Sequence, residues 1–461
     1  MKIKDIKFRT WLIALGVFII AAPLVWMMLA RLEGTNPAVV LEPASLSLGL
    51  SQEITITATD AKTGLRKAWI GLLKDGKETV LFQKDYPSPG ITGSGRVVQD
   101  TFSVRIEPKK LGLTDGKAVL RLALWDNSWR GWMQGNKAYI EKDVSIDTVP
   151  PRIRVLTRFH NISQGGAGLV IYSLTEPCPR NGVYVGDSFF AGYSGNFNDK
   201  RVHMAYFALD YSQGPQTEFY ITAVDAAGNS ARSGFPHYVR KRSFKKDVIA
   251  LSDSFLSWKM PEFDMPGAQN ADLTLSEKFL KVNRDLRQSS YQQLIKETGK
   301  TEPSLLWTGD FLRLPNSARQ AGFADHRAYN YNGRTIDHQV HLGVDLASTA
   351  HSPVPAANSG KVVFVGDIGI YGRTVIIDHG FGLFSMYSHL SGANVQSGEA
   401  VQRGKIIGNT GLTGLAGGDH LHFGMMIQHA FVDPIEWWDA AWIKNNITDK
   451  ISSVKSTLGA E

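Results

Sequence analysis

The chain of 461 residues contains a single cysteine, Cys178. One thiol excludes an internal disulfide framework and any zinc module built from several cysteines. An excess of one charge is also missing: 50 Lys and Arg face 43 Asp and Glu, and a net charge of +7 over this length says little about partners. Only one long apolar run occurs, which excludes a polytopic membrane protein. With 43% hydrophobic residues and 45 glycines, the chain has the material for several turn-rich domains.

The one apolar run extends from Trp11 to Ala30 and contains no charged residue. As a helix it would be about 30 Å long, which matches the hydrocarbon core of a bilayer. The basic residues Lys2, Lys4, Lys7 and Arg9 precede it, with only Asp5 opposing them. The positive-inside rule therefore predicts a cytoplasmic tail over 1–10, a transmembrane anchor over 11–30 and a body outside the cytoplasm. We expect a single-pass protein of the inner membrane, with most of the chain periplasmic.

A cleaved signal peptide is the alternative interpretation of this run. Its apolar region would normally cover roughly 7 to 15 residues and end in a small-x-small cleavage site. Here the run is longer and ends in Met-Met-Leu-Ala-Arg-Leu-Glu, a poor cleavage site. No cysteine lies nearby, which excludes a lipoprotein. An uncleaved anchor is favoured, and whether the helix is cleaved stays open.

Two stretches in the middle of the chain alternate between apolar and polar residues. Alternation with a period of two, rich in Thr, Val and Ile, predicts half-buried strands. The first stretch, 38–147, has such runs at 53–59, 97–106 and 118–125, and the second, 148–240, has them at 153–156, 168–173, 201–209 and 217–224. Pro150-Pro151 cannot continue a central strand and marks the boundary between the two.

The two stretches end alike. The first has Asp126 followed by Gly135-Asn136, and the second has Asp225 followed by Gly228-Asn229. Asp and Gly-Asn suit a tight connection before a last strand. The pattern resembles bacterial immunoglobulin-like repeats, which implies two immunoglobulin-like β-sandwich domains. We expect them to act as spacers or as binding arms for an envelope protein.

Residues 247–300 follow a different pattern, with Leu275, Phe279, Val282 and Leu286 recurring at roughly helical spacing. This predicts a helical connector. The basic run at 240–246 precedes it and contains only one aromatic residue, so we interpret it as a solvated linker and expect no nucleic acid partner.

Histidine is concentrated near the C-terminus: only three of the 12 histidines precede residue 300. Two clusters stand out, His341-Leu-Gly-Val-Asp345 and His420-Leu-His422. Zinc binds imidazole nitrogens and carboxylate oxygens, and a catalytic site keeps three protein ligands and one open position. Residues two apart on a strand face the same side, so His420 and His422 would enter one cleft. His341 and Asp345 can join them if the chain turns at Gly343.

The residues between the two clusters predict a compact antiparallel sheet. Runs beginning at Gly360, Thr374, Leu383 and Val401 are strand candidates, and glycines separate them. No His-Glu-x-x-His motif occurs, which excludes the helix-borne zinc chemistry of that motif.

From about Gly322 to Trp438 the chain resembles the lysostaphin/LytM-type zinc endopeptidases of bacterial cell walls. The shared pattern, in chain order, is H-x-G-x-D at 341–345, P-V-x-A-A at 353–357, G-x-V-V at 360–363, Y-G-x-T-V-I-I-D-H-G at 371–380, Y-S-H-L at 387–390, V-x-x-G-x-x-V-x-x-G-x-x-I-G at 395–408, T-G at 413–414 and H-L-H-F-G at 420–424. The resemblance implies an antiparallel β-sheet peptidase domain over 322–440, followed by a tail over 441–461.

The resemblance also implies roles for individual residues. His341, Asp345 and His422 would hold one Zn²⁺ per chain, and His389 and His420 would be unliganded catalytic histidines. Which of these two is the general base stays open. Tyr387 is interpreted as an aromatic residue packed in a strand. The alternative is that it assists catalysis near the oxyanion. His338, His351, His379 and His429 are interpreted as structural, with His379 in a turn that holds the sheet.

These features predict a membrane-anchored zinc endopeptidase that hydrolyses peptide bonds in peptidoglycan stems or cross-links. The alternative is a non-catalytic peptidoglycan-binding regulator that activates other wall hydrolases. Regulators of this kind typically lack a metal ligand, and this chain retains all of them. A third hypothesis is autoinhibition, in which the amide oxygen of Asn330 or Asn332 occupies the open metal position.

Overall fold

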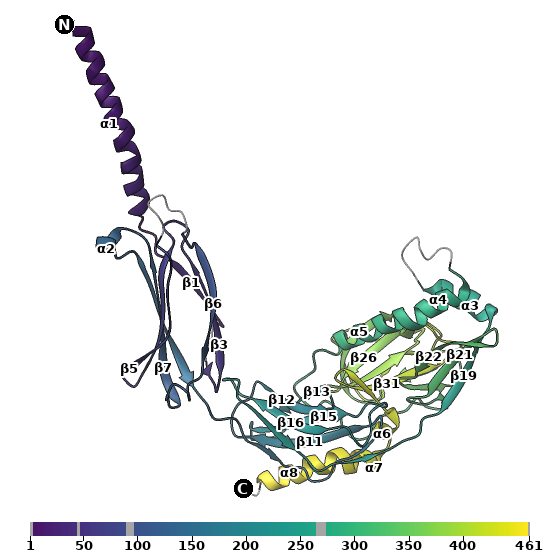
Figure 1. Ribbon diagram of the computed structural model, residues 1–461. Helices are drawn as coiled ribbons and strands as arrows, with labels where there is room; N and C mark the ends of the chain where they lie inside the picture. Colours follow the sequence, from purple (N-terminus) through teal and green to yellow (C-terminus); the bar gives the residue numbers. More distant parts are fainter. Residues whose placement is uncertain (1–2, 44–46, 89–95, 264–272, 460–461) are drawn as a thin grey trace. The chain divides into compact units, whose positions relative to one another are not determined.

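A computed structural model describes residues 3–43, 47–88, 96–263 and 273–459 (Figure 1). The chain divides into two compact units. Unit 1 comprises 1–150 with 224–230, and unit 2 comprises 151–223 with 231–461. The prediction of a mainly β protein with one N-terminal apolar helix and a C-terminal β-sheet domain is confirmed. The bounds of the predicted domains stay a prediction.

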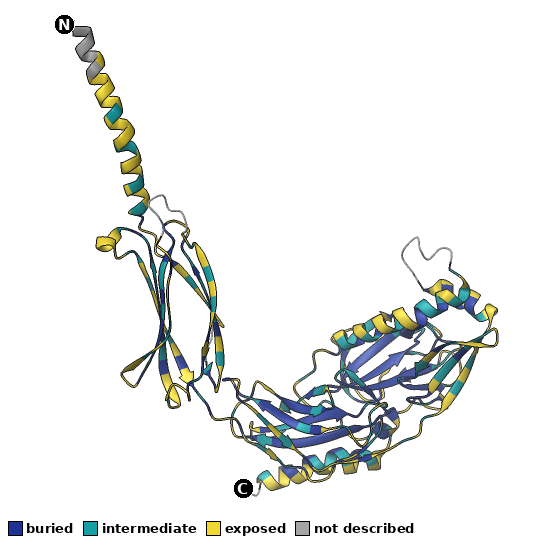
Figure 2. Ribbon diagram, in the orientation of Figure 1, coloured by how far each residue is buried: buried dark blue, intermediate teal, exposed yellow. Residues whose placement is uncertain are grey.

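Unit 1 begins with helix α1 (Ile3–Arg31). Its segment from Thr10 to Arg31 is long and apolar enough to cross a membrane. Its large apolar side chains between Phe8 and Leu29 are mostly exposed, and Figure 2 shows this part of the helix largely in yellow. Such a surface needs an apolar surrounding, which agrees with a membrane-spanning segment. Lys2 lies outside the described residues.

After α1, the described residues of unit 1 form two β-sheets and the short helix α2 (Arg130–Met133). One sheet has the order β1 (Ala38–Glu42), β3 (Gln52–Thr59) and β6 (Gln99–Ile106), and the other has the order β2 (Ser47–Leu48), β8 (Lys137–Ile146), β7 (Gly116–Asp126), β4 (Leu65–Lys74) and β5 (Lys77–Asp85). Alternate residues of β3 are buried, among them Ile54 and Ile56, and they share one core with Leu120 and Leu122 of β7. The alternation read from the sequence therefore places one face of each sheet in a common core. The immunoglobulin-like assignment stays a prediction.

Unit 2 begins with further β-sheets. One has the order β14 (Tyr193–Ser194), β15 (Val202–Ala208), β11 (Ala167–Leu174), β9 (Ile153–Val155), and another the order β13 (Ser188–Ala191), β12 (Arg180–Val185), β16 (Phe219–Val224), β17 (Ser230–Gly234). The parallel pair β10 (Asn161–Ser163) and β18 (Tyr238–Arg240) completes this part. Cys178 is buried in this core, which fits a structural thiol.

The predicted connector begins with a strand, and helices follow this strand in most of its other described residues. Strand β19 (Lys246–Leu251) pairs in parallel with β21 (His326–Tyr331), which pairs with β22 (Arg334–Val340). The helices are α3 (Asp253–Lys259), the 3₁₀ turn η1 (Met260–Glu262), α4 (Leu275–Lys281), the π-helix η3 (Val282–Leu286) and α5 (Arg287–Glu297). A capping box between Thr274 and Glu277 starts α4. Residues 264–272 of the connector lie outside the described residues.

The C-terminal domain is organised around an eight-stranded sheet. Its order is β20 (Ala318–Ala321), β23 (Val344–Ala347), β31 (Leu421–Ile427), β27 (Leu383–Ser388), β26 (Gly372–Asp378), β25 (Gly360–Ile368), β29 (Ala400–Val401), with β32 (Ala430–Val432) paired to β31. A smaller sheet joins β24 (Pro353–Pro355), β30 (Ile406–Asn409) and β28 (Gly392–Ala393), and the 3₁₀ turn η4 (Gly369–Tyr371) links β25 to β26. Every residue of β27 and β31 is buried, so this sheet is a rigid support for the site.

The predicted tail over 441–461 is instead packed structure up to residue 459. After α6 (Pro434–Trp438) come α7 (Ala440–Ile443), the π-helix η5 (Lys444–Thr448) and α8 (Asp449–Gly459). Ile443, Ile447, Ile451 and Val454 are buried in the core that α8 shares with β11. Their spacing of three and four residues marks one face of a helix, a signal that the sequence interpretation missed.

Candidate metal centre and active site

Neighbouring strands deliver the histidines and the aspartate to one place. Asp345 of β23 lies directly opposite His422 of β31 in the antiparallel register. His422 also lies opposite Ser388, the last residue of β27, so that His389 follows beside it. His420 immediately precedes β31 and forms an isolated bridge with Gly411. Paired residues on adjacent strands share a face, so Asp345 and His422 project from the same side of the sheet. His389 lies just after β27, where its φ of 61° departs from strand geometry, and its ring centroid is 5.8 Å from that of His422.

Three candidate metal ligands converge. Asp345 Oδ1 lies 2.9 Å from His341 Nε2 and 2.9 Å from His422 Nδ1, and the two histidine nitrogens are 3.0 Å apart. All three residues are buried. Tetrahedral zinc with bonds of ~2.0–2.2 Å separates its ligand atoms by about 3.3 Å, so the three donors are close to the spacing that zinc needs.

The chemistry of the donors also fits a cation. His341 Nδ1 lies 2.8 Å from the Gly322 carbonyl oxygen, which assigns the proton to Nδ1 and leaves a lone pair on Nε2. A second proton, on Nε2, can satisfy the 2.9 Å contact with Asp345 Oδ1, and a bound cation would take the place of that proton, with both lone pairs directed at it. Burial alone would raise the pKa of Asp345, but His341, His420 and His422 hold it well below its usual range, so the carboxylate is charged.

Gly343 makes room for this arrangement. A Cβ at this position would lie 2.6 Å from Cε1 and Nε2 of the His422 ring and 2.8 Å from the Phe423 carbonyl oxygen. These distances are shorter than a carbon atom tolerates, so any side chain must displace the histidine. A glycine is therefore required at position 343, because only a residue without Cβ lets the backbone approach the His422 ring this closely.

Gly343→Ala is expected to lower zinc affinity by about 10-fold or more, because it displaces one ligand while leaving all three in the chain. Zinc titration with a competing chelator measures the change. Gly392→Ala is the matched control, since a Cβ there meets no atom within 4 Å. Equal zinc affinity in the two variants would contradict the packing argument.

Arg327 is a site residue that the sequence interpretation missed. It lies on β21, and its Nη2 donates to Asp345 Oδ2 at a distance of 2.9 Å. Burial opposes the charge of Arg327, yet Asp345 raises its pKa, so the pair is ionic. Asp345 thus presents Oδ1 to the histidines while Arg327 holds its other oxygen, which fixes the orientation of the carboxylate.

Arg327→Met is expected to lower zinc affinity by about 10- to 100-fold, the usual effect of losing a group that orients a metal ligand. The same chelator competition measures it. Arg334→Met on the exposed part of β22 is the control. If Arg327→Met binds zinc as tightly as wild type, the ion pair does not orient the ligand.

His389 and His420 lie beside the three candidate ligands, and each ring, like that of His341, is bonded through Nδ1 to a backbone carbonyl oxygen. His389 Nδ1 lies 2.8 Å from the Thr413 carbonyl oxygen, and His420 Nδ1 lies 2.7 Å from the Gly418 carbonyl oxygen. Each ring therefore carries a proton on Nδ1, and the Nε2 of a neutral ring is free to accept another. The ring centroids are 4.8 Å apart, and His420 Nε2 is 3.6 Å from Asp345 Oδ1.

The environments of the two rings differ. Burial holds the pKa of His389 well below its usual range, and the neighbouring His420 and His422 act in the same direction. Burial also disfavours the charged form of His420, but Asp345 outweighs it and raises the pKa. His389 also has a positive φ of 61°, which residues other than glycine rarely adopt. Backbone strain of this kind is common at functional sites.

All five predicted site residues line one cavity of about 340 Å³. Its other walls are largely apolar and come from β19, the connector helices, η4 and the loop before β31. Tyr371 of η4, also missed from the sequence, lines it, with its ring centroid 5.4 Å from that of His422. A largely apolar cavity with a few convergent polar groups is the usual form of a ligand site.

Other residues considered from the sequence lie elsewhere. The Tyr387 hydroxyl accepts hydrogen bonds from Ala357 N–H and Ser385 Oγ and does not line the cavity. Buried His379 bonds to the Ser359 carbonyl and to Ser385, as a structural residue would. His338 and His351 are exposed, and His429 stacks on Phe190.

The hypothesis that Asn330 or Asn332 occupies the open metal position is wrong. The Asn330 side-chain oxygen accepts a hydrogen bond from Thr335 Oγ1 at 2.7 Å. Asn332 has a φ of 52° in the turn between β21 and β22. Neither residue lines the cavity.

Comparisons with known proteins find a family match in the region that carries the site. Residues 339–434 match the sequence profile of Peptidase family M23. The chain is 36% identical over 109 residues to the DD-carboxypeptidase/endopeptidase Mpg of Neisseria meningitidis, covering 23% of this chain and 25% of that protein. It is 32% identical over 116 residues to the peptidoglycan DD-endopeptidase ShyB of Vibrio cholerae, covering 25% of this chain and 26% of that one. The chain thus spans about a quarter of the length of these curated relatives.

A solved structure is also similar. The catalytic domain of lysostaphin from Staphylococcus simulans is 31% identical, with 27% of this chain and 94% of that chain covered and a TM-score of 0.24. The family profile covers strands β23 and β31, which carry Asp345 and His422, and His389 just after β27. The profile match places an M23 domain in the C-terminal part of this chain, over residues 339–434.

Proposed function

We propose that this protein is a membrane-anchored zinc endopeptidase that hydrolyses peptide bonds in peptidoglycan stems or cross-links. The observation that carries the proposal is the complete donor set of His341, Asp345 and His422 beside two further histidines in one cavity. Two of the relatives bear names that describe endopeptidases, and one of these names specifies peptidoglycan. A cell-wall peptide is thus the substrate class that similarity favours.

The three ligands would hold one zinc ion per chain. Bound zinc would polarise the scissile carbonyl and lower the pKa of a water towards ~7. His389 and His420 present their Nε2 atoms to the same space, so one can take a proton from the attacking water and return it to the leaving amine. His420 beside Asp345 is suited to hold a proton, because Asp345 raises its pKa, and burial keeps the His389 ring neutral with its Nε2 unprotonated.

Helix α1 supports the localisation in this proposal. The apolar run over 11–30 and the basic residues before that run favour a single crossing, with the domains in the periplasm. An inner-membrane anchor would keep the peptidase within reach of the wall layer. The β-sheet domains between anchor and peptidase would then act as spacers, or as the surface for an envelope partner.

Digestion of purified sacculi by the full-length protein tests the proposal. Wild type in zinc-containing buffer should release soluble muropeptides, and His422→Ala should release none. No release by wild type would overturn the enzymatic function. If that same protein bound no zinc but raised the activity of another wall hydrolase, the regulator hypothesis would replace it.

A further inference from the structure

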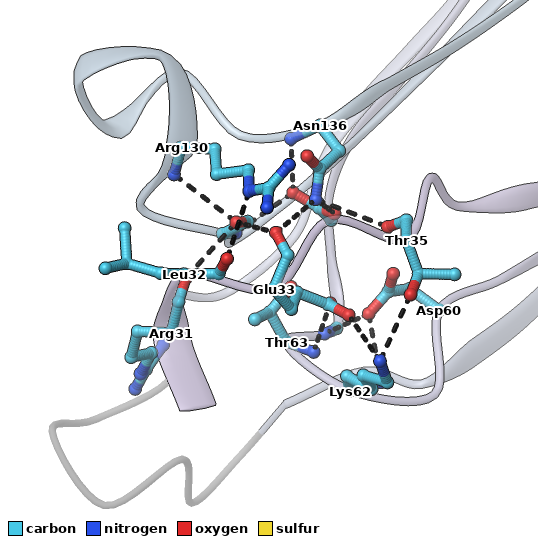
Figure 3. A network of polar contacts seen from close by, with 12 residues as sticks. Arg31, Leu32, Glu33, Thr35, Asp60, Lys62, Thr63, Arg130 and Asn136 are labelled. Atoms are coloured by element: carbon cyan, nitrogen blue, oxygen red, sulfur yellow. Dashed lines mark hydrogen bonds and ion pairs between the residues drawn. The ribbon is translucent and has the colours of Figure 1, made fainter. Parts of the chain in front are cut away.

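The loop between β7 and β8 is bonded to the residues that end helix α1. The Trp129 N–H donates to the Arg31 carbonyl at 2.7 Å, and Ser128 Oγ donates to the Glu33 carbonyl at 2.9 Å. Arg130 Nε donates to the Leu32 carbonyl at 3.0 Å. Figure 3 shows Arg130 reaching the backbone at Leu32. The loop is therefore fixed at the point where the apolar segment ends.

The segment after α1 is fixed to the β-sheets as well. The buried Glu33 side chain accepts hydrogen bonds from Thr63 N–H at 3.1 Å and Thr63 Oγ1 at 2.9 Å. Asn136 Nδ2 donates to the carbonyls of Glu33 and Thr35, both at 3.2 Å, and to Asp126 Oδ2 at 2.7 Å. Figure 3 shows these contacts around Glu33. The Asp and Gly-Asn motif of the first stretch thus clamps the segment that leaves α1.

The tip of the same loop exposes large apolar side chains. Trp132 is 99% exposed and Met133 is 67% exposed. Gly131, Trp132 and Met133 have φ values of 61°, 57° and 67°, and two of them are not glycine. Arg66 holds the loop in this form, since its guanidinium donates to the carbonyls of Met133 and Gln134. A strained backbone and exposed large apolar side chains are both common at sites of interaction, so we infer that this loop contacts another surface.

We propose that this loop docks on the membrane surface at the outer end of α1, with Trp132 and Met133 inserted at the level of the lipid headgroups. The inference rests on the proposed crossing of the membrane by α1. Arg31 is the first charged residue after the apolar run, and the loop is bonded to it, so the loop is held at the height of the interface. Tryptophan is enriched at that level. Arg31, Arg66 and Arg130 around the loop suit anionic headgroups.

Spin labelling of the full-length protein in vesicles of zwitterionic and anionic phospholipid tests this docking. A Cys178→Ser background removes the native thiol, and a nitroxide is placed by Gln134→Cys on the exposed side of the loop. Lys77→Cys is the matched control. The loop follows the end of β7, which pairs with the start of β4, whereas Lys77 pairs with Lys74 at the end of β4. Position 77 therefore lies at the opposite end of the sheet from the loop. Val17→Cys within α1 reports on the anchor itself.

The expected result is a higher ratio of oxygen to nickel-complex accessibility at position 134 than at position 77. The combined change Trp132→Ser and Met133→Ser should lower it to the level at position 77, and Trp132→Phe, which keeps the apolar ring, should preserve it. Equal ratios at 134 and 77, with a lipid-exposed label at position 17, would overturn the docking alone. A water-exposed label at position 17 would instead overturn the anchor, and the docking with it.

Discussion

His422→Ala is expected to reduce zinc from one ion per chain to a small fraction of that, with at least a 100-fold loss of affinity. Changes to groups that only support a ligand cost about 10- to 100-fold, so losing a ligand should cost more. His422 Nδ1 is 2.9 Å from Asp345 Oδ1 and 3.0 Å from His341 Nε2, and its removal leaves two donors. Metal analysis of the purified full-length protein measures the result.

The matched control is His420→Ala. His420 is two residues away and lies 3.6 Å from the same aspartate oxygen, but its Nδ1 is bonded to a carbonyl and it is outside the group of three donors. It should retain about one zinc. Loss of zinc in His420→Ala with retention in His422→Ala would reverse the assignment of ligand and catalytic residue.

His389→Ala is expected to lower the rate of wall-peptide hydrolysis by about 100- to 10,000-fold while zinc stays bound, the usual range for the loss of a general acid or base. The His389 Nε2 faces the cavity, and its Nδ1 is committed to the Thr413 carbonyl. Release of muropeptides, measured together with zinc content, separates a loss of chemistry from a loss of metal.

A surface histidine provides the control for this loss. His351 is exposed and outside the cavity, so His351→Ala should hydrolyse at the wild-type rate. Comparing His389→Ala with His420→Ala then shows which histidine contributes more, a question that the sequence leaves open. If His389→Ala keeps full activity, His389 is not part of the catalytic machinery.

Much of the fold follows from the local sequence. The run at 53–59 falls within strand β3, where burying one face imposes a period of two. The run at 168–173 falls within strand β11, which is buried on both faces and is apolar almost throughout. The spacing of His420 and His422 likewise predicts their common cleft, because strand geometry fixes the direction of both side chains. The histidine and aspartate motifs therefore predict which residues meet, and their roles as ligands and as catalysts stay proposals.

The features that were missed depend on contacts between distant segments. Arg327 joins the site because β21 passes beside Asp345, and nothing near Arg327 in the chain indicates that partner. Tyr371 reaches the cavity through a short 3₁₀ turn, which has no periodic signal. The expected C-terminal tail is packed because its apolar stripe finds a surface on β11, which lies far away in the sequence. Local patterns predict elements better than they predict their partners.

The most direct test of the central claim uses a purified cross-linked muropeptide dimer and the full-length protein in zinc-containing buffer. Chromatography with mass spectrometry follows the products. The proposed activity predicts conversion of the dimer to fragments whose summed mass equals the dimer plus one water, with no conversion by His422→Ala. An intact dimer after incubation with zinc-loaded wild type, or equal conversion by the two proteins, would contradict it.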